Sequence, residues 1–284
     1  MARASRTYCQ VDESRGPRPR RRLRHVEGSG FRRLFSNRAG GAIAVIVLKR
    51  TFDMVVSVLA LALASPLMAV MLLLIWAQDG RSPLFMGVRV GRGHHDFRMA
   101  KLRSMRPDSE FQGAASTSRS DGRITPLGRT LRRWKLDEIP QFWNVLRGDM
   151  SLVGPRPNTR RGGVDRYNGT EARLLSVRPG ITDLASILFA DEAEILDGAA
   201  DPDALYDAVI RPWKSRLGLL YIDHRDFPTD LLIIGLTALA VVSRPLALRG
   251  VDTILARWGA GDELRRVCRR LEPPPRAEPP GQPA

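Results

Sequence analysis

Residues 134–157 read WKLDEIPQFWNVLRGDMSLVGPRP. In this stretch Asp137 and Glu138 stand side by side, just before Pro140. Proline is tolerated only in the first turn of a helix, so the pair is predicted to lie at a helix start. Neighbouring side chains on a helix point about 100° apart, which predicts different roles for the two carboxylates. The free N–H groups of a helix start favour the ionised form, and an ionised Asp137 can serve as a nucleophile or a metal ligand.

Basic residues surround this acidic pair. Those near it in the sequence, or brought to it by a predicted hairpin, are Lys101, Arg103, Arg123, Arg129, Arg132, Arg133, Arg147 and Arg156. Guanidinium groups bind phosphate oxygens in pairs, and Pro155 and Pro157 fix the backbone on both sides of Arg156. The combination favours a site for a diphosphate. On the residues alone, an acidic pair that only decorates a helix start and a proline turn that is only a rigid surface feature stay open as alternatives.

An uncharged stretch, Met54–Ala77, precedes these motifs. As a helix rising roughly 1.5 Å per residue it would be about 36 Å long, enough to cross a bilayer. Pro66 removes one helical N–H and crowds the carbonyl of Ala62, which predicts a kink or a break at Ser65-Pro66, with the Ser65 hydroxyl as a partner for the freed backbone. Because both flanks are basic, a helix that enters and leaves on one face and a kinked spanning helix both remain open.

The rest of the chain predicts a mixture of strands and helices. Residues 84–105 have the pattern of a β-hairpin turning at Gly91-Arg92-Gly93, with Lys101 and Arg103 on one face of its second arm. Helices are expected from Thr125-Pro126, from near Leu136, over 203–222 with an interruption at Pro212, and over 231–242. The last of these is too short to span a bilayer and is expected to be buried or interfacial.

The positive charge of the chain is concentrated at its N-terminus. The formal net charge is +15, and residues 1–50 contain 13 Arg or Lys against three acids. Such an arm suits an anionic polymer or membrane surface, or else is a solvated disordered tail. No aromatic platform alternates with the arginines, so nucleic acid is not an expected partner. Cys9 and Cys268 lie in opposite terminal segments and imply no disulfide framework, and His94-His95 lacks a third metal ligand nearby.

Four motifs in this order resemble those of a known family. They are Lys101-Leu-Arg-Ser-Met105, Leu136-Asp-Glu-Ile-Pro-Gln141, the stretch from Asn144 to Pro157, and Arg178-Pro-Gly-Ile-Thr182. Together they resemble the bacterial sugar transferases, the monotopic phosphoglycosyl transferases, over about Leu48 to Val242. The resemblance implies an α+β monotopic membrane protein: a re-entrant helix broken at Ser65-Pro66, a β-hairpin, and amphipathic interfacial helices around a small cytosolic catalytic domain. The domain boundaries expected are a basic disordered arm over 1–46, the re-entrant helix over 47–80, the catalytic domain over 81–244 and a polar, Pro-rich tail over 245–284.

The resemblance also implies a reaction and its residues. Asp137 would attack the β-phosphate of a UDP-sugar, UMP would leave, and undecaprenyl phosphate would take the phosphosugar from the enzyme. Glu138 is the partner of Asp137 in the family's acidic dyad, and Mg²⁺, with Asp137 as its expected ligand, assists. The residues expected to bind the nucleotide and the phosphates are Lys101, Arg103, Arg132, Pro155, Arg156, Pro157 and Arg178. The expected location is the inner membrane with the catalytic domain facing the cytosol, in contact with membrane lipids, and a homodimer stays open.

Several positions depart from the family pattern. Lys135 stands where Ser is usual, Asp183 replaces Gly after Pro-Gly-Ile-Thr, and Met86-Gly87 replaces Arg-Gln in the hairpin. These changes leave the sugar, and the glycan pathway it would enter, open. Two other functions also stay open on the residues: a non-enzymatic membrane adaptor whose arginines bind anionic lipids, and a metal-dependent phosphatase acting on lipid diphosphates.

Overall fold

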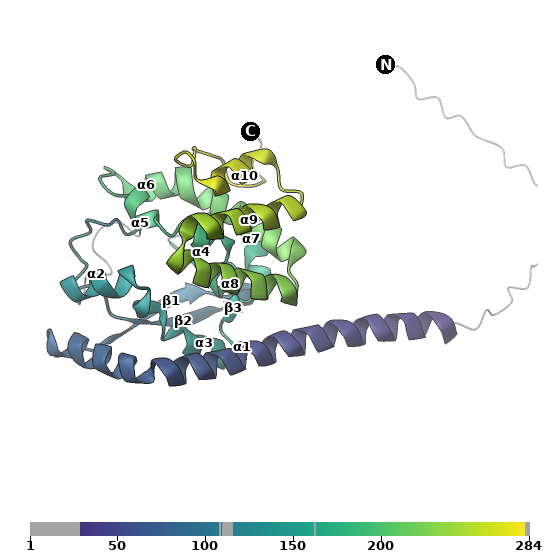
Figure 1. The fold of residues 1–284 in the computed structure, drawn as a ribbon, viewed down its shortest axis with the longest axis horizontal. Helices are drawn as coiled ribbons and strands as arrows, with labels where there is room; N and C mark the ends of the chain where they lie inside the picture. The colour runs from purple at the N-terminus through teal and green to yellow at the C-terminus, as the bar shows by residue number, and fades with distance from the viewer. Residues whose placement is uncertain (1–28, 108, 110–115, 162, 282–284) are drawn as a thin grey trace, which may run out of the picture. The chain divides into compact units, whose positions relative to one another are not determined.

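A computed structural model describes residues 29–281 except 108, 110–115 and 162, with side chains from residue 45 onward. The chain divides into two units, Met1–Ile43 and Ala44–Ala284, and all the residues of the site belong to the second. The elements are α1 (Ser29–Ala77), β1 (Leu84–Val90), η1 (Arg92–His94), β2 (Asp96–Leu102), α2 (Pro126–Arg133), η2 (Leu136–Glu138), α3 (Gln141–Arg147), β3 (Ser151–Val153), η3 (Val164–Arg166), η4 (Glu171–Ser176), β4 (Gly180–Thr182), α4 (Leu184–Leu188), α5 (Glu192–Ile195), α6 (Pro202–Leu205), the π-helical turn η5 (Tyr206–Ile210), α7 (Arg211–His224), α8 (Phe227–Val242), α9 (Arg244–Arg257) and α10 (Asp262–Arg269). Helices and two two-stranded sheets agree with the predicted mixed class (Figure 1).

Helix α1 runs without interruption through Ser65-Pro66, so of the predicted kink or break this structure shows no break. The Ser65 hydroxyl donates a hydrogen bond of 2.8 Å to the carbonyl of Ala62, the acceptor that loses its helical partner because residue 66 is proline. Within the described part of the chain, Val45–Ala77 is the one helix long and apolar enough to cross a membrane, with a mean hydropathy of 2.7. Only 6% of its most apolar window is buried, which fits a surface that faces lipid.

The predicted hairpin is confirmed: β1 and β2 pair antiparallel along their whole length. The free edge of β2 is occupied by one side chain of α3. Asn144 Oδ1 accepts a hydrogen bond from Ala100 N at 2.8 Å, and Asn144 Nδ2 donates one to Arg98 O at 2.7 Å. The asparagine of the stretch quoted first therefore fixes α3 against the hairpin that carries Lys101.

Helix α2 begins as predicted, because Thr125 Oγ1 accepts a hydrogen bond from Gly128 N at 2.9 Å. Leu131 of α2 is buried together with Ile75 of α1 and Leu102 of β2, and Leu136 packs against this cluster. The turn that carries Asp137 is therefore seated on the C-terminal end of the apolar helix.

The main core is formed by α4, α7, α8 and α9 together with Leu152 and Val153 of β3, which pairs parallel with β4, and Trp213 of α7 is fully buried in it. Helix α8 is buried on one side, with Ile233 at 0% exposure, and exposed on the other, with Val242 at 85%. The short apolar helix predicted over 231–242 is thus a core helix with one uncovered apolar face.

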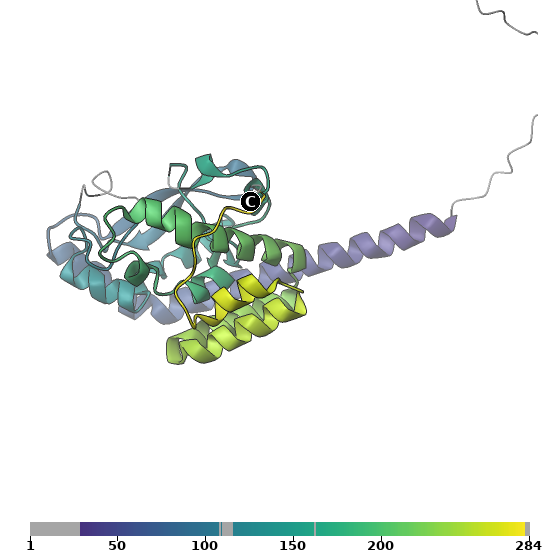
Figure 2. The same cartoon turned by 90° about the horizontal axis from the view of Figure 1, so that it is seen from above.

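The structure differs from two of the predicted domain boundaries, one at each end of the chain. Residues 245–269 are not a polar tail, because they form most of α9 and α10 (Figure 2). Leu248, Val251, Leu255 and Val267 are buried in the main core. Spacings of three and four residues place the first three on one helix face, but intervening arginines give the stretch a polar average. At the other end residues 29–46 belong to α1, while residues 1–28 of the predicted arm lie outside the described residues.

Candidate active site

The acidic pair lies in a short 3-10 turn, η2, rather than in a longer helix starting near Leu136. Lys135, which precedes the turn, has a left-handed backbone with φ of 57° and makes no side-chain cap. Helix α3 begins only after Pro140, which occupies its N-cap position. The chain therefore bends twice around Asp137 and Glu138, which holds the two side chains in different surroundings.

Glu138 is held by two cations. Arg156 donates to it from both terminal nitrogens, Nη2 to Oε1 at 2.6 Å and Nη1 to Oε2 at 3.0 Å, and Lys101 Nζ lies 3.3 Å from Oε1. Burial alone would raise the pKa of Glu138, but the charges of Arg156 and Lys101 outweigh burial and hold that pKa well below its usual range. Glu138 is therefore ionised, and both of its oxygens are engaged.

Asp137 is in the opposite situation. Its side chain is only 5% exposed, yet it lines the cleft, and it forms no hydrogen bond or ion pair with another described residue. Burial raises the pKa of Asp137, the charge of Lys101 acts against this, and the charge of Glu138 adds to it. The ionisation expected from a helix dipole thus depends instead on neighbouring cations. Among the described residues, Asp137 therefore interacts with its neighbours through their charges and not through a hydrogen bond.

Lys101, Arg132 and Lys135 lie close enough to both acids for their charges to interact with them. Arg132 Nε donates to Ser104 Oγ at 2.9 Å, which aims the guanidinium group from α2. Burial lowers the pKa of Lys101 and of Arg132, so both are cations drawn partly out of water. Charges in such surroundings interact with an anionic ligand more strongly than exposed ones. The other cations of this wall are Arg129 and Arg133.

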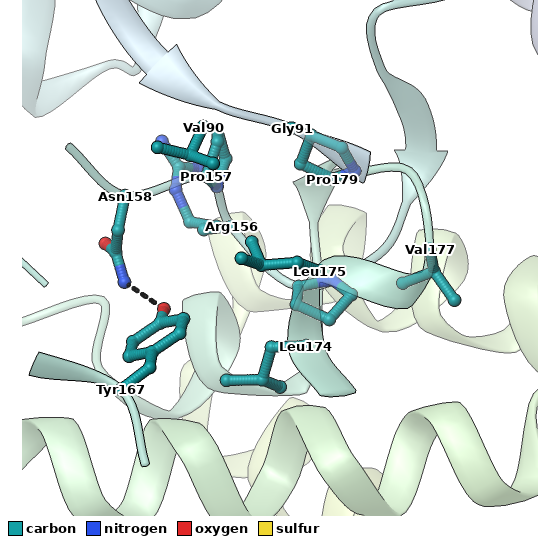
Figure 3. A pocket seen from close by; sticks show the side chains of 11 residues that line it. Val90, Gly91, Arg156, Pro157, Asn158, Tyr167, Leu174, Leu175, Val177 and Pro179 are labelled. Atoms are coloured by element: carbon teal, nitrogen blue, oxygen red, sulfur yellow. Dashed lines mark hydrogen bonds between the residues drawn. The ribbon is translucent and has the colours of Figure 1, made fainter. Parts of the chain in front are cut away.

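The turn Pro155-Arg156-Pro157 is held from behind. Arg156 Nη1 donates to Ile181 O at 2.9 Å, and Arg156 N donates to an oxygen of Asp183 at 3.3 Å. Val90, Leu175 and other apolar side chains surround the rear of the turn (Figure 3). The predicted preorganisation of Arg156 has this physical basis, with Glu138 as its anchor.

Two predicted phosphate-binding residues lie elsewhere. Arg103 follows the last residue of β2, and its guanidinium binds Asp79 at 2.5 and 2.6 Å and the carbonyl of Ser82 at 2.8 Å, where it ties the end of α1 to the hairpin. Arg178 Nε donates to Gly148 O at 3.0 Å. Neither side chain lines the cleft, so the structure does not bring Arg103 or Arg178 to the acidic pair.

Another part of the cleft lining, called the far wall below, comes from a region in which the sequence showed no motif. The cleft has a volume of about 1390 Å³, and its far wall includes Asp183, Asp191, Tyr206, Arg211 and Lys214. Asp183 caps α4 by accepting from Ser186 N at 2.6 Å. The spacing of Arg211, Lys214 and Ser215 along α7 places polar side chains on one helix face, and this pattern could have identified the wall.

The residues of the site fit Mg²⁺ only if the phosphates of a bound ligand supply part of its coordination. In the described part of the chain, no group of three or more His, Cys, Asp or Glu side chains could hold a metal. Mg²⁺ is commonly held by one or two carboxylates together with substrate phosphates and water. Asp137 has free oxygens for this role, whereas both oxygens of Glu138 are occupied. A metal held by Asp137 and the phosphates of a ligand is compatible with the residues present.

Comparison with known proteins shows which family this chain resembles in sequence. The family model described as "bacterial sugar transferase" matches residues 44–244. The chain is 40% identical over 153 residues to the UDP-N-acetylgalactosamine-undecaprenyl-phosphate N-acetylgalactosaminephosphotransferase of Aeromonas hydrophila, covering 53% of this chain and 36% of that protein. It is 45% identical over 146 residues to the undecaprenyl-phosphate glucose phosphotransferase of Komagataeibacter xylinus, covering 49% of this chain and 27% of that protein.

A third relative matches along nearly its whole length. The exopolysaccharide production protein PSS of Rhizobium leguminosarum bv. phaseoli is 35% identical over 213 residues, which is 70% of this chain and 97% of that protein. The first two relatives are matched over only about a third of their length, but the family model covers most of this chain. The chain belongs to the bacterial sugar transferase family.

Proposed function

We propose that this protein transfers a sugar 1-phosphate from a UDP-sugar to undecaprenyl phosphate and releases UMP. Two of the relatives are named for transfer to undecaprenyl phosphate, and one of these names includes a UDP-sugar. The observation that carries the proposal is the contrast within the acidic pair: Glu138 is fully engaged by Arg156 and Lys101, while Asp137 faces the cleft without a hydrogen-bonding partner among the described residues.

The reaction has two steps in this proposal. A carboxylate oxygen of Asp137 attacks the β-phosphorus of the UDP-sugar, the bond from that phosphorus to UMP breaks, and an aspartyl phosphosugar forms. A phosphate oxygen of undecaprenyl phosphate then attacks the same phosphorus, and the bond to Asp137 breaks. The carboxylate is restored, and the product is an undecaprenyl diphosphosugar.

The cations of the site stabilise the charge that develops at phosphorus. Lys101 and Arg132 are aimed at the acidic pair and drawn partly out of water, where such groups are most effective. Glu138 acts by holding Arg156 and Lys101 in place, and not by exchanging a proton. Mg²⁺, when bound by Asp137 and the substrate phosphates, would neutralise phosphate charge.

The location follows from the substrates. UDP-sugars are cytosolic, so the catalytic face is assigned to the cytosol and the apolar helix to the inner membrane, in contact with lipid. The basic residues on both flanks of Met54–Ala77 support re-entry, with Ser65-Pro66 as the point at which α1 would bend in a bilayer.

Asp137→Asn tests the activity. Membranes containing the variant and wild type are incubated with undecaprenyl phosphate and, in turn, UDP-glucose, UDP-galactose and UDP-N-acetylgalactosamine, and UMP and inorganic phosphate are measured. The wild type should release UMP with at least one donor, and the variant should release none while staying in the membrane. Asp165→Asn, which changes an exposed carboxylate that does not line the cleft, is the matched control. UMP release by the variant at the wild-type rate would contradict the role of Asp137, and phosphate release without a donor would indicate a phosphatase.

A further inference from the structure

Residues 245–281 lie beyond the stretch matched by the family model and pack onto the catalytic unit in two places. The first part consists of α9 and α10. The second part, residues 271–281, is extended and crosses α7, and it is called the strap below (Figure 2). Arg270, at the end of α10, contacts residues that line the cleft, and the strap reaches the cleft through residues packed behind its lining.

The strap supplies a hydrogen bond that α7 lacks. In a continuous α-helix the carbonyl of Ala208 would accept from the N–H four residues later, but that residue is Pro212, which has none. The π-helical turn η5 forms at this point, and Ala277 N of the strap donates to Ala208 O at 3.0 Å. Trp213 Nε1 donates to Pro275 O at 3.0 Å as a second tie. The interruption predicted at Pro212 is therefore bridged by the strap.

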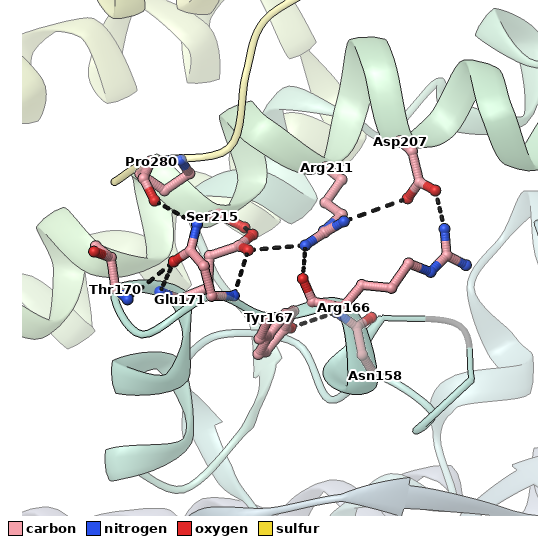
Figure 4. Close-up of polar contacts among 10 residues, drawn as sticks. Asn158, Arg166, Tyr167, Thr170, Glu171, Asp207, Arg211, Ser215 and Pro280 are labelled. Carbon is pink, nitrogen blue, oxygen red and sulfur yellow. Dashed lines mark hydrogen bonds and ion pairs between the residues drawn. The ribbon is translucent and has the colours of Figure 1, made fainter. Parts of the chain in front are cut away.

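The end of the strap braces a buried charged group in the wall. Asn168 Nδ2 donates to Pro280 O at 2.9 Å, and Asn168 Oδ1 accepts from Glu171 N at 2.9 Å. Glu171, which is fully buried, accepts from Arg211 Nη2 at 2.8 Å and from Ser215 Oγ at 2.7 Å (Figure 4). The strap therefore holds Asn168, and Asn168 holds Glu171. Glu171 in turn positions Arg211 and Ser215, which line the cleft.

Helix α10 reaches the same wall from another side. Arg270, its C-cap, forms an ion pair with Asp191, and its guanidinium lies 5.9 Å from the ring centroid of Phe189. Asp191 also binds Arg244 at 2.7 Å. Asp191 and Phe189 line the cleft, while Arg270 does not. Arg270 therefore acts on the cleft through residues that it holds.

We propose that residues 245–281 position the wall of the cleft that binds the nucleotide sugar, with Arg270 and the strap as its supports. This inference rests on the proposed function. The lipid phosphate arrives from the side of α1, on whose end the acidic turn is seated. The supported residues include Asp191, which precedes α5, and Arg211 of α7, and both are polar. Helix α5 lies on the side of this unit remote from α1 (Figure 1), which suits a water-soluble donor.

Arg270→Gln tests the proposal in the full-length protein. If the reaction passes through a covalent intermediate, kcat/KM for the donor and for undecaprenyl phosphate report separate half-reactions. With whichever of the three UDP-sugars yields UMP, we expect kcat/KM for the donor to fall by about tenfold, within the range for displaced positioning groups, and kcat/KM for undecaprenyl phosphate to stay unchanged. Arg270→Lys should recover part of the loss, and Arg266→Gln, an exposed position on the same helix, should behave as wild type.

A second pair of variants tests the strap. Ala277→Pro removes the N–H that binds Ala208 O, and Ala277→Gly keeps it. We expect the proline variant to lower kcat/KM for the donor while kcat/KM for undecaprenyl phosphate stays unchanged. The glycine variant should not lower kcat/KM for the donor. The proposal would be overturned if kcat/KM fell equally for the donor and for undecaprenyl phosphate, or if neither the Arg270 variants nor the Ala277 variants lost activity. Absence of UMP release by the wild type would instead overturn the proposed function.

Discussion

Replacing Glu138 by glutamine removes the charge that holds Arg156 and Lys101 while keeping the shape of the side chain. Glu138 receives two hydrogen bonds from Arg156, at 2.6 and 3.0 Å, and its side chain is 15% exposed. Removing one partner of a buried ion pair costs about 3–5 kcal/mol. Because the Arg156 side chain keeps 29% of its surface exposed, we expect E138Q to lower the free energy of unfolding by about 3 kcal/mol, the lower end of that range.

Thermal unfolding of the detergent-solubilised protein, followed by tryptophan fluorescence, measures this loss. At this size about 1 kcal/mol shifts the melting temperature by about 2–4 °C, so E138Q should melt about 6–12 °C below wild type. Glu194→Gln is the matched control, because the Arg119 and Glu194 side chains are 70% and 62% exposed and such a pair contributes about 1 kcal/mol or less. An E138Q melting temperature as near to wild type as that of E194Q would refute the reasoning.

The same difference should depend on pH in one direction. The pKa of Glu138 is held below its ordinary value of 4.5, so its stabilising contribution is complete above that value and is lost as the pH falls below it. The gap in melting temperature between wild type and E138Q should therefore be constant from about pH 7 to about pH 5 and should narrow at lower pH. A gap that narrows as the pH rises would contradict this assignment.

Three further predictions concern packing and topology. Gly180→Ala places a Cβ 2.1 Å from the backbone nitrogen of Gly154, just before Pro155 and Arg156. In the same melting assay it should destabilise the protein by about 1–3 kcal/mol or more. Gly169→Ala is the control and should not destabilise it, because the space around Gly169 is open. Cys268 is fully buried and burial raises the pKa of its thiol to about 12, so in a Cys9→Ser background iodoacetamide near pH 8 should modify it only after unfolding; rapid labelling of the folded protein would mean that α10 is not docked. If α1 re-enters, a cysteine at Gln78 should resist a membrane-impermeant reagent added outside intact cells, and external labelling would show that the helix spans.

The sequence located one half of the site because that half is built from local motifs. Asp137, Glu138 and Arg156 were predicted as a group, and Arg156 binds Glu138 in the structure. The contact spans only eighteen residues, and a rigid turn determines where the arginine lies. Alternation along a strand also predicted that Lys101 would reach the pair, and it does.

The same alternation misplaced Arg103, because β2 ends at Leu102 and the next residue is captured by Asp79. A strand pattern does not show where pairing stops, and a competing acid at the end of α1 was not visible without the fold. The far wall of the cleft was missed for a related reason: Arg211 and Asp191 are held there by Glu171 and Arg270, which are distant in sequence. Contacts of this range leave no pattern in the sequence near either partner, although the polar spacing along α7 marks one face of that helix.

The nature of α1 shows a different limit. Pro66 predicted a kink or a break because it removes a hydrogen bond, but the Ser65 hydroxyl donates to the Ala62 carbonyl and the helix is continuous. Proline therefore determines where this helix can bend, while the surroundings of the helix determine whether it does.

The central claim is that Asp137 becomes joined to a phosphosugar. The most direct measurement is intact-protein and peptide mass spectrometry of enzyme quenched after incubation with the active UDP-sugar in the absence of undecaprenyl phosphate, together with the amount of UMP released. We predict one UMP per enzyme molecule and a sugar-phosphate adduct on the peptide containing Asp137, removed when undecaprenyl phosphate is added. UMP release without an adduct, or an adduct that persists in Asp137→Asn, would contradict the account.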